Sequence, residues 1–396
     1  MRRMWSWGLA VTGGLFFTSG AVALQGQPPV QPGDPVPGLS ASELARFQAG
    51  KAKFMEVEGQ AKGLGPVFNG AACAECHKSG AVGGANVDLQ VARVTRIGGF
   101  VAGVYSDLTD VGGPVIQARS LAEFIPGYPI PGEVVPPGTE FVSHRITTPL
   151  FGAGLIEAIP DATLLALASR PQPDGIRGVP NMVLNPESGR IEIGRFGWKA
   201  QHSTLHMFAA DAFANEMGIT NPLFPNENLP QGLPIPPGAD TVADPEDNGA
   251  GVMAVTTFME FLAPPPQRLP PDAVRGYQVF TRIHCSSCHT PLLRTGRSPS
   301  SALSMKQIAP YSDLLLHHMG SQLADGIRQG NAEGDQFRTA PLWGMRFRTF
   351  FLHDGRATTI DQAVQAHGGE AAAAAHRFEH LGADDRRVLL SFLSGI

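Results

Sequence analysis

The chain has 396 residues, of which 43% are hydrophobic, and its formal net charge is −5. This apolar content is enough for real hydrophobic cores, and the length predicts two domains. No basic stripe with interleaved aromatic residues occurs, which argues against nucleic acid as a partner. Charged residues are few (16%), while glycine (47) and proline (34) are abundant. This composition indicates long ordered loops around a small number of helices.

Residues 1–23 have the pattern of an export signal peptide. Arg2 and Arg3 give a positive start, and an apolar run of about a dozen residues, too short to span a membrane well, follows them. The small residues from Ala21 to Ala23 suit a signal peptidase. An uncleaved anchor is the alternative. Cleavage predicts a periplasmic chain without a membrane span. We expect this chain to start with a loose Pro-rich N-terminal arm over residues 24–42.

The four cysteines all lie in two copies of one motif, Cys-x-x-Cys-His. The copies comprise Cys73, Cys76 and His77, and Cys285, Cys288 and His289. Disulfides would be possible in an oxidising compartment, but Cys-x-x-Cys disulfides are redox-active, and no thioredoxin-like pattern surrounds them. A four-cysteine zinc site does not require the adjacent histidines.

Covalent haem attachment explains all three residues of each motif. The two thiols add to the vinyl groups of haem, and the histidine that follows becomes the proximal ligand of the iron. Two such motifs that use every cysteine of an exported chain predict two covalently bound haem c groups, with His77 and His289 as iron ligands.

The two motifs head two related segments. A phenylalanine precedes each first cysteine by five residues, and an apolar helical pattern ends each segment, at residues 251–263 and 385–396. We therefore expect a mainly α-helical protein with two cytochrome-c-like haem domains and long Pro/Gly-rich loops. The expected bounds are 43–262 for the N-terminal domain, 263–271 for a proline-rich linker and 272–396 for the C-terminal domain. The first domain carries proline-rich insertions at 124–138 and 221–238.

Several stretches resemble the bacterial di-haem cytochrome c peroxidase and MauG superfamily, most closely its di-haem oxidoreductase branch. The first to be noted is "FLHDGRATTIDQAVQAHGGEA" (351–371), and the others are "TTPLFGAGLIEAIPDATL" (147–164), "GRFGWKA" (194–200), "NEMGIT" (215–220), "YSDLLLHHMG" (311–320) and "RTAPLWG" (338–344). Together they span nearly the whole mature chain. The resemblance implies a di-haem oxidoreductase with a peroxidase-like activity.

The resemblance also implies the second iron ligand of the C-terminal haem. In the family a short helix after an HDG-type turn delivers this ligand, as Met in peroxidases and Tyr in MauG. This chain has His367 there, followed by two glycines that allow close approach to a flat cofactor. A helix-capping role is the alternative for His367. A histidine at this position predicts a bis-histidine haem.

For the N-terminal haem, residues 196–218 resemble the peroxidase stretch that runs from an inter-haem tryptophan to the peroxide-side residues. The match gives Trp198 the inter-haem position and Glu216 the place of the catalytic carboxylate. His206 stands near the family's distal glutamine, as an acid/base group or as an iron ligand that closes the site; His202 and Met207 are weaker candidates. Each could instead be an ordinary core or helix residue. The family's calcium ligands are not matched, since Ile146 follows Arg145.

Three functions stay open from the sequence. A peroxidase, or a MauG-like enzyme that oxidises a partner protein, needs an N-terminal haem with an open face. A plain di-haem electron-transfer protein has both irons closed by side chains. A maturation or metal-handling partner is the third. We expect a small redox protein, a cytochrome c or a cupredoxin, as electron donor, and hydrogen peroxide or a partner protein as substrate.

Overall fold

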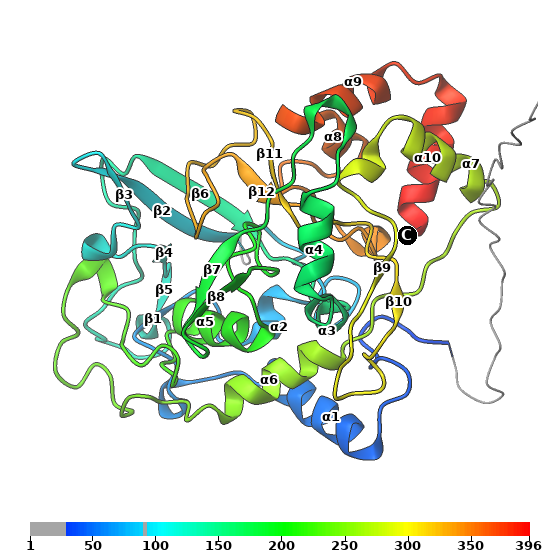
Figure 1. Cartoon of the computed structure of the whole chain (residues 1–396). Helices are drawn as coiled ribbons and strands as arrows, with labels where there is room; N and C mark the ends of the chain where they lie inside the picture. The colour runs from blue at the N-terminus through cyan, green and yellow to red at the C-terminus, as the bar shows by residue number, and fades with distance from the viewer. Residues whose placement is uncertain (1–28, 90–92) are drawn as a thin grey trace, which may run out of the picture.

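The computed structural model describes residues 29–89 and 93–396 (Figure 1). The predicted export signal, residues 1–23, lies outside the described residues. Within the described ranges, no helix has both the length and the apolar character needed to cross a membrane.

The described residues form ten α-helices and twelve short strands. The helices are α1 (Ala41–Met55), α2 (Cys73–Cys76), α3 (Ala153–Glu157), α4 (Asp161–Ala168), α5 (Leu205–Met217), α6 (Ala250–Phe261), α7 (Ala273–Arg282), α8 (Ile360–Gln365), α9 (Ala372–Glu379) and α10 (Ala383–Gly395). The strands are β1 (Val67–Phe68), β2 (Arg93–Val101), β3 (Val104–Ser106), β4 (Val115–Ile116), β5 (Arg119–Ser120), β6 (Phe141–Ile146), β7 (Met182–Asn185), β8 (Arg190–Ile193), β9 (Leu293–Arg294), β10 (Gln307–Ile308), β11 (Leu316–His318) and β12 (Gln336–Arg338).

The expectation of a mainly α-helical protein holds only in part. Long loops and small antiparallel sheets occupy much of the described chain, as Figure 1 shows. The largest sheet joins β3, β2 and β4, and β6 also pairs with β2. The sequence reading missed this sheet because exposed and buried side chains do not alternate cleanly along β2. The sheet matters for the site because β2 and β6 contribute side chains to a cavity described below.

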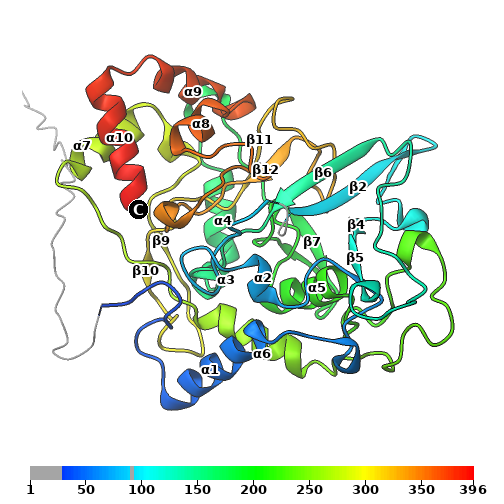
Figure 2. The same cartoon turned by 180° about the vertical axis from the view of Figure 1, so that it is seen from behind.

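Two helix pairs stand at separate ends of the molecule, α1 with α6 and α7 with α10 (Figures 1 and 2). In each pair the helices cross at a glycine. A Cβ atom on Gly50 of α1 would lie 2.2 Å from the carbonyl oxygen of Ala254 in α6. A Cβ on Gly276 of α7 would lie 2.5 Å from the carbonyl oxygen of Val388 in α10. Only glycine permits such close backbone contact, so the two helix pairs have equivalent crossings.

Each helix pair belongs to a separate hydrophobic core. The larger core gathers α1, α3, α5 and α6, and it also takes in Leu293 and Leu303 from the C-terminal part of the chain. The smaller core surrounds α7 and α10, with Phe280, Phe378 and Phe392 at its centre. The hairpin of β9 and β10, from the second half of the sequence, therefore packs against the larger core.

The described part of the N-terminal arm is not loose, which corrects the sequence-based expectation. The backbone N–H of Val36 donates to Phe261 at 2.7 Å, and the N–H of Ala263 donates to Asp34 at 3.0 Å. Val36 itself is buried. The arm therefore pairs with the end of α6 and the start of the proline-rich segment, because this short extended stretch finds backbone partners there.

Candidate functional site

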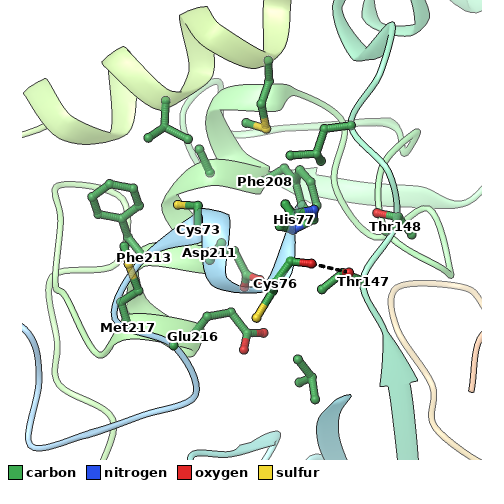
Figure 3. Close-up of a pocket in the computed structure, with 18 of the residues that line it drawn as sticks. Cys73, Cys76, His77, Thr147, Thr148, Phe208, Asp211, Phe213, Glu216 and Met217 are labelled. Atoms are coloured by element: carbon green, nitrogen blue, oxygen red, sulfur yellow. Dashed lines mark hydrogen bonds between the residues drawn. The ribbon is translucent and has the colours of Figure 1, made fainter. Parts of the chain in front are cut away.

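The first Cys-x-x-Cys-His motif lines a large cavity. Cys73 and Cys76 lie on the single turn of α2, so both thiols and the His77 ring face the same space (Figure 3). The cavity holds about 1080 Å³ of space between atoms, its open mouth included. Helices α5 and α6, strands β2 and β6 and neighbouring loops supply much of its lining, which is mostly apolar.

The His77 ring is arranged as a metal ligand. Its Nδ1 lies 3.1 Å from the carbonyl oxygen of Gly84, so Nδ1 carries the proton and donates it. Burial lowers the pKa of His77 to about 4, and the ring is therefore neutral at physiological pH. A neutral imidazole whose Nδ1–H is bound to a carbonyl has its Nε2 lone pair free for iron.

The second motif lines a second cavity of about 1270 Å³, measured in the same way. His289 repeats the arrangement of His77: its Nδ1 lies 2.9 Å from the carbonyl oxygen of Tyr311, and burial lowers its pKa to about 4. His367 lines the same cavity just after α8. Its Nδ1 lies 2.7 Å from the carbonyl oxygen of Ala363, one turn back, and burial lowers its pKa. Two of the histidines in the second cavity, His289 and His367, thus have lowered pKa values and an Nδ1 bound to a backbone carbonyl, and His284, His317 and His353 line the same space.

The residues present fit two haems. Each cavity combines a pair of free thiols, at least one neutral histidine with a free Nε2, and a mostly apolar lining suited to a porphyrin. His353 also lines the second cavity. Its ring stacks on Phe337 at a centroid distance of 4.2 Å.

Trp198 lines both cavities. Its indole N–H donates to the carbonyl of Ile146 at 2.7 Å, and its own carbonyl accepts from the N–H of Arg338 at 2.8 Å. Strand β6 therefore holds the indole ring, and strand β12 holds the backbone of Trp198. Trp198 therefore borders both cavities, and its inter-haem role stays a prediction.

Glu216 points into the first cavity from the last turn of α5, on the side where Cys76 also projects (Figure 3). Its carboxylate accepts a hydrogen bond from Asn69 at 3.2 Å. Burial raises the pKa of Glu216 to about 7; the Arg96 guanidinium opposes this shift and the Asp211 carboxylate adds to it. A carboxyl with a pKa near neutrality can both accept and donate a proton at physiological pH.

The sequence reading missed Arg96 and Asp211, which line the same cavity. Arg96 lies on β2, and no motif surrounds it that could have marked it. Asp211 lies on α5 five residues before Glu216, and its carboxylate is 3.4 Å from the Nε2 of buried His202. A polar residue on the cavity side of an otherwise apolar helix was the one signal available for Asp211.

His206 does not face either cavity, which corrects its predicted haem-side role. Its Nδ1 lies 3.2 Å from a carboxylate oxygen of Glu187, and it lines neither the first nor the second cavity. It lies in the first turn of α5, and its side chain points to Glu187 in the turn between β7 and β8. Helical periodicity alone could not tell which polar residues of α5 face the cavity. Among the described residues, His77 is the only histidine in the first cavity.

Lys199, which follows Trp198 in the chain, belongs to a cluster of buried charged side chains. Arg145 and Asp325 form an ion pair at 2.7 Å, and the ammonium of Lys199 lies 3.3 Å from the same carboxylate group. Lys199 is fully buried and also donates to the carbonyls of Glu333 and Gln336 at 2.7 and 2.8 Å. Arg145 also lines the first cavity, but its side chain is engaged with Asp325 and Gln329.

A search of curated proteins found no match. Among solved structures, the chain is similar to a MauG-like protein associated with microbial copper homeostasis, at 14% identity and a TM-score of 0.43 over 93% of each chain. It is similar to the diheme peroxidase BthA of Burkholderia thailandensis, at 14% identity and a TM-score of 0.39 over 88% of this chain and 85% of the other. It is also similar to the hydrazine synthase of Kuenenia stuttgartiensis, at 14% identity and a TM-score of 0.41 over the whole of both chains.

A protein-family model matches residues 140–396, well over half of the chain. The matched region holds the second Cys-x-x-Cys-His motif, Trp198, Glu216 and His367, whereas the first motif lies before it. The family is described as "Di-haem oxidoreductase, putative peroxidase", and this chain belongs to it.

Proposed function

We propose that the chain is an exported, periplasmic oxidoreductase that holds two covalently bound haem c groups and reduces hydrogen peroxide in the first cavity. The second cavity would serve electron transfer, through a haem ligated by His289 and His367. Family membership supports a di-haem, peroxidase-like oxidoreductase. The two Cys-x-x-Cys-His motifs support covalent attachment, and the signal-like residues 1–23 support export.

The difference between the two cavities carries the proposal. Five histidines line the second cavity, and two of them, His289 and His367, each have Nδ1 bound to a backbone carbonyl, as a histidine that binds iron through Nε2 would. The first offers one, His77, and the described residues place a carboxyl with a pKa near 7 in the same space. A cavity with one strong ligand and an acid/base group suits a reactant, while one with two strong ligands suits electron storage.

Peroxide reduction consumes two electrons and two protons and yields two molecules of water. When bound, the haems supply redox-active iron, which provides the electrons and a Lewis-acidic position for the reactant. Glu216 supplies the proton path: its ionised form takes a proton from one peroxide oxygen and returns it to the oxygen that departs. The guanidinium of Arg96, in the same cavity, is placed to stabilise negative charge that develops on the departing oxygen.

The electrons would arrive at the second cavity from a small redox protein, a cytochrome c or a cupredoxin. Trp198 lines both cavities and offers a polarisable ring between them. If the physiological reductant is instead a side chain of a partner protein, the enzyme is MauG-like. The same arrangement of Trp198 and the two cavities would serve either source of electrons.

Electron paramagnetic resonance of the ferric protein, followed by stopped-flow mixing with peroxide, tests the proposal. We expect one high-spin and one low-spin signal, or two low-spin signals of which one becomes high-spin after one-electron reduction. We also expect the half-reduced protein to lose its ferrous absorption bands rapidly on mixing. Two permanently low-spin haems and a protein inert to peroxide would instead identify a di-haem electron carrier.

A further inference from the structure

Two arginines line the second cavity, the buried Arg338 and the partly buried Arg348, and neither has an acidic partner among the described residues. Arg338 ends β12 and is 8% exposed, and Arg348 follows a short turn after Trp343. Both also line a smaller space beside Trp198. Among the described residues, no carboxylate forms an ion pair with either guanidinium within 4.0 Å.

Every hydrogen bond that the two side chains make goes to a backbone carbonyl. Arg338 donates from Nε to Gly197 at 2.9 Å and from Nη1 to Thr339 at 3.4 Å. Arg348 donates from Nη2 to Pro341 at 2.8 Å, while its buried Nε has no partner. Several N–H donors therefore remain unused in a space that borders the cavity.

The electrostatics of this pair call for an anion. Burial lowers the pKa of both guanidinium groups to about 10, and the charge of Arg348 contributes to the shift of Arg338. Two like charges held close together in a poorly solvated space without a counter-charge destabilise the folded protein. A ligand that brings carboxylates into the second cavity would remove this penalty, and guanidinium groups bind carboxylates with charge-assisted hydrogen bonds.

We propose that Arg338 and Arg348 bind the propionate carboxylates of the haem in the second cavity. Haem carries two propionates at the edge opposite its vinyl groups, so the thiols of Cys285 and Cys288 would fix one edge and the arginines the other. The propionate edge would then lie beside Trp198, because Arg338 also holds the Gly197–Trp198 backbone through its side chain and its own N–H. The inference rests on the haem content proposed above.

The test is the reduction potential of the low-spin haem in Arg338→Gln and Arg348→Gln, measured by spectroelectrochemistry between pH 5.5 and 9. Intact mass first establishes that each variant carries two haems, so that a failure of haem attachment is recognised separately. Loss of a positive charge next to the haem favours the ferric form, so the potential should fall at pH 8. We expect at least a tenfold change in the ferric/ferrous equilibrium constant, which corresponds to about 59 mV for one electron.

A second signature separates propionate binding from a general effect on structure. A propionate released from a guanidinium has a higher pKa, so the potential of each glutamine variant should depend more steeply on pH than that of the wild type. The conservative variants Arg338→Lys and Arg348→Lys keep the charge and should recover most of the potential. Should a glutamine variant fail to load haem, the lysine variants still report the potential and its pH dependence.

Arg346 provides a matched control. It lies two residues from Arg348, donates to Pro266 at 2.7 Å and also lacks a carboxylate partner, but it does not line the second cavity. Arg346→Gln should leave the potential and its pH dependence unchanged. Wild-type potentials in both glutamine variants would overturn the inference. So would a wild-type potential that varies with added acetate or sulfate, because a free anion would then occupy the arginines.

Discussion

The indole N–H of Trp198 donates to the carbonyl oxygen of Ile146 at 2.7 Å, and this bond fixes the ring where the two haem cavities share a wall. Ile146 is the last residue of β6, so the sheet that contains β2 and β6 sets the orientation of the ring. The neighbouring ring of His353 lies at a centroid distance of 6.5 Å, edge to face. The tryptophan is thus held by a hydrogen bond to β6 and by an edge-to-face contact with His353.

Trp198→Phe should slow electron transfer between the two haems without changing iron ligation, because phenylalanine keeps an aromatic ring but loses the indole and its bond to Ile146. Rapid mixing of the half-reduced protein with peroxide measures the rate at which the second haem is oxidised. Trp343→Phe is the matched control, since Trp343 is buried and lines only the smaller adjacent space. Equal rates in wild type and Trp198→Phe would exclude a role for the indole.

His367→Met should raise the reduction potential of the second haem and keep it low-spin. A thioether donates less electron density to ferric iron than imidazole does, so the ferrous form gains relative stability. The exposed His376 on α9 supplies a control, and His376→Met should have no effect on the potential. An unchanged potential in His367→Met would mean that another side chain ligates the iron, although His367 faces the cavity.

Lys199→Met should destabilise the protein, by roughly 3–5 kcal/mol in the free energy of unfolding, as expected when one partner of a buried ion cluster is removed. The variant leaves the carbonyls of Glu333 and Gln336 without a donor, and Asp325 keeps only Arg145 as its charged partner. Urea unfolding followed by circular dichroism measures the change. Lys62→Met removes an exposed lysine and should change stability by far less. Similar stabilities in the two variants would contradict this account of Lys199.

The sequence could predict what local motifs and helical periodicity encode. The Cys-x-x-Cys-His motifs identify thiols and histidines that the structure brings into the two cavities, and apolar spacing predicts the helices that end the two segments. It could not predict contacts between distant loops. Arg96 enters the first cavity through the pairing of β2 with β6, and His206 stays outside it because its side of α5 faces Glu187. Neither outcome depends on a local pattern.

Replacement of both thiols of one motif tests attachment directly. Cys73→Ala combined with Cys76→Ala should lower the intact mass by one haem, and Cys285→Ala combined with Cys288→Ala should do the same for the other cavity. Because the cavities have different histidine sets, the two double variants should also differ in spectrum: the first retains the site of His289 and His367, the second that of His77. Two covalent haems in either variant would refute covalent attachment through these thiols.

Glu216→Gln should lower the rate of the peroxide reaction by about 10²–10⁴-fold, the usual contribution of a general acid/base group, while the haem spectra stay nearly unchanged. In the wild type the rate should rise with pH and level off above about 7, because burial raises the pKa of Glu216 to about 7 and the ionised form is the base. The glutamine variant should lose this pH dependence.

Two neighbours of Glu216 make the assignment sharper, because they should move the midpoint of the pH profile in opposite directions. Arg96 favours the ionised carboxylate, so Arg96→Gln should raise the midpoint, whereas Asp211 disfavours it, so Asp211→Asn should lower the midpoint. Stopped-flow rates across pH 5 to 9 measure both shifts. A purely structural defect in either variant would change the rate at every pH by the same factor and leave the midpoint in place. Midpoints that stay fixed in both variants would mean that a group other than Glu216 accepts the proton from peroxide.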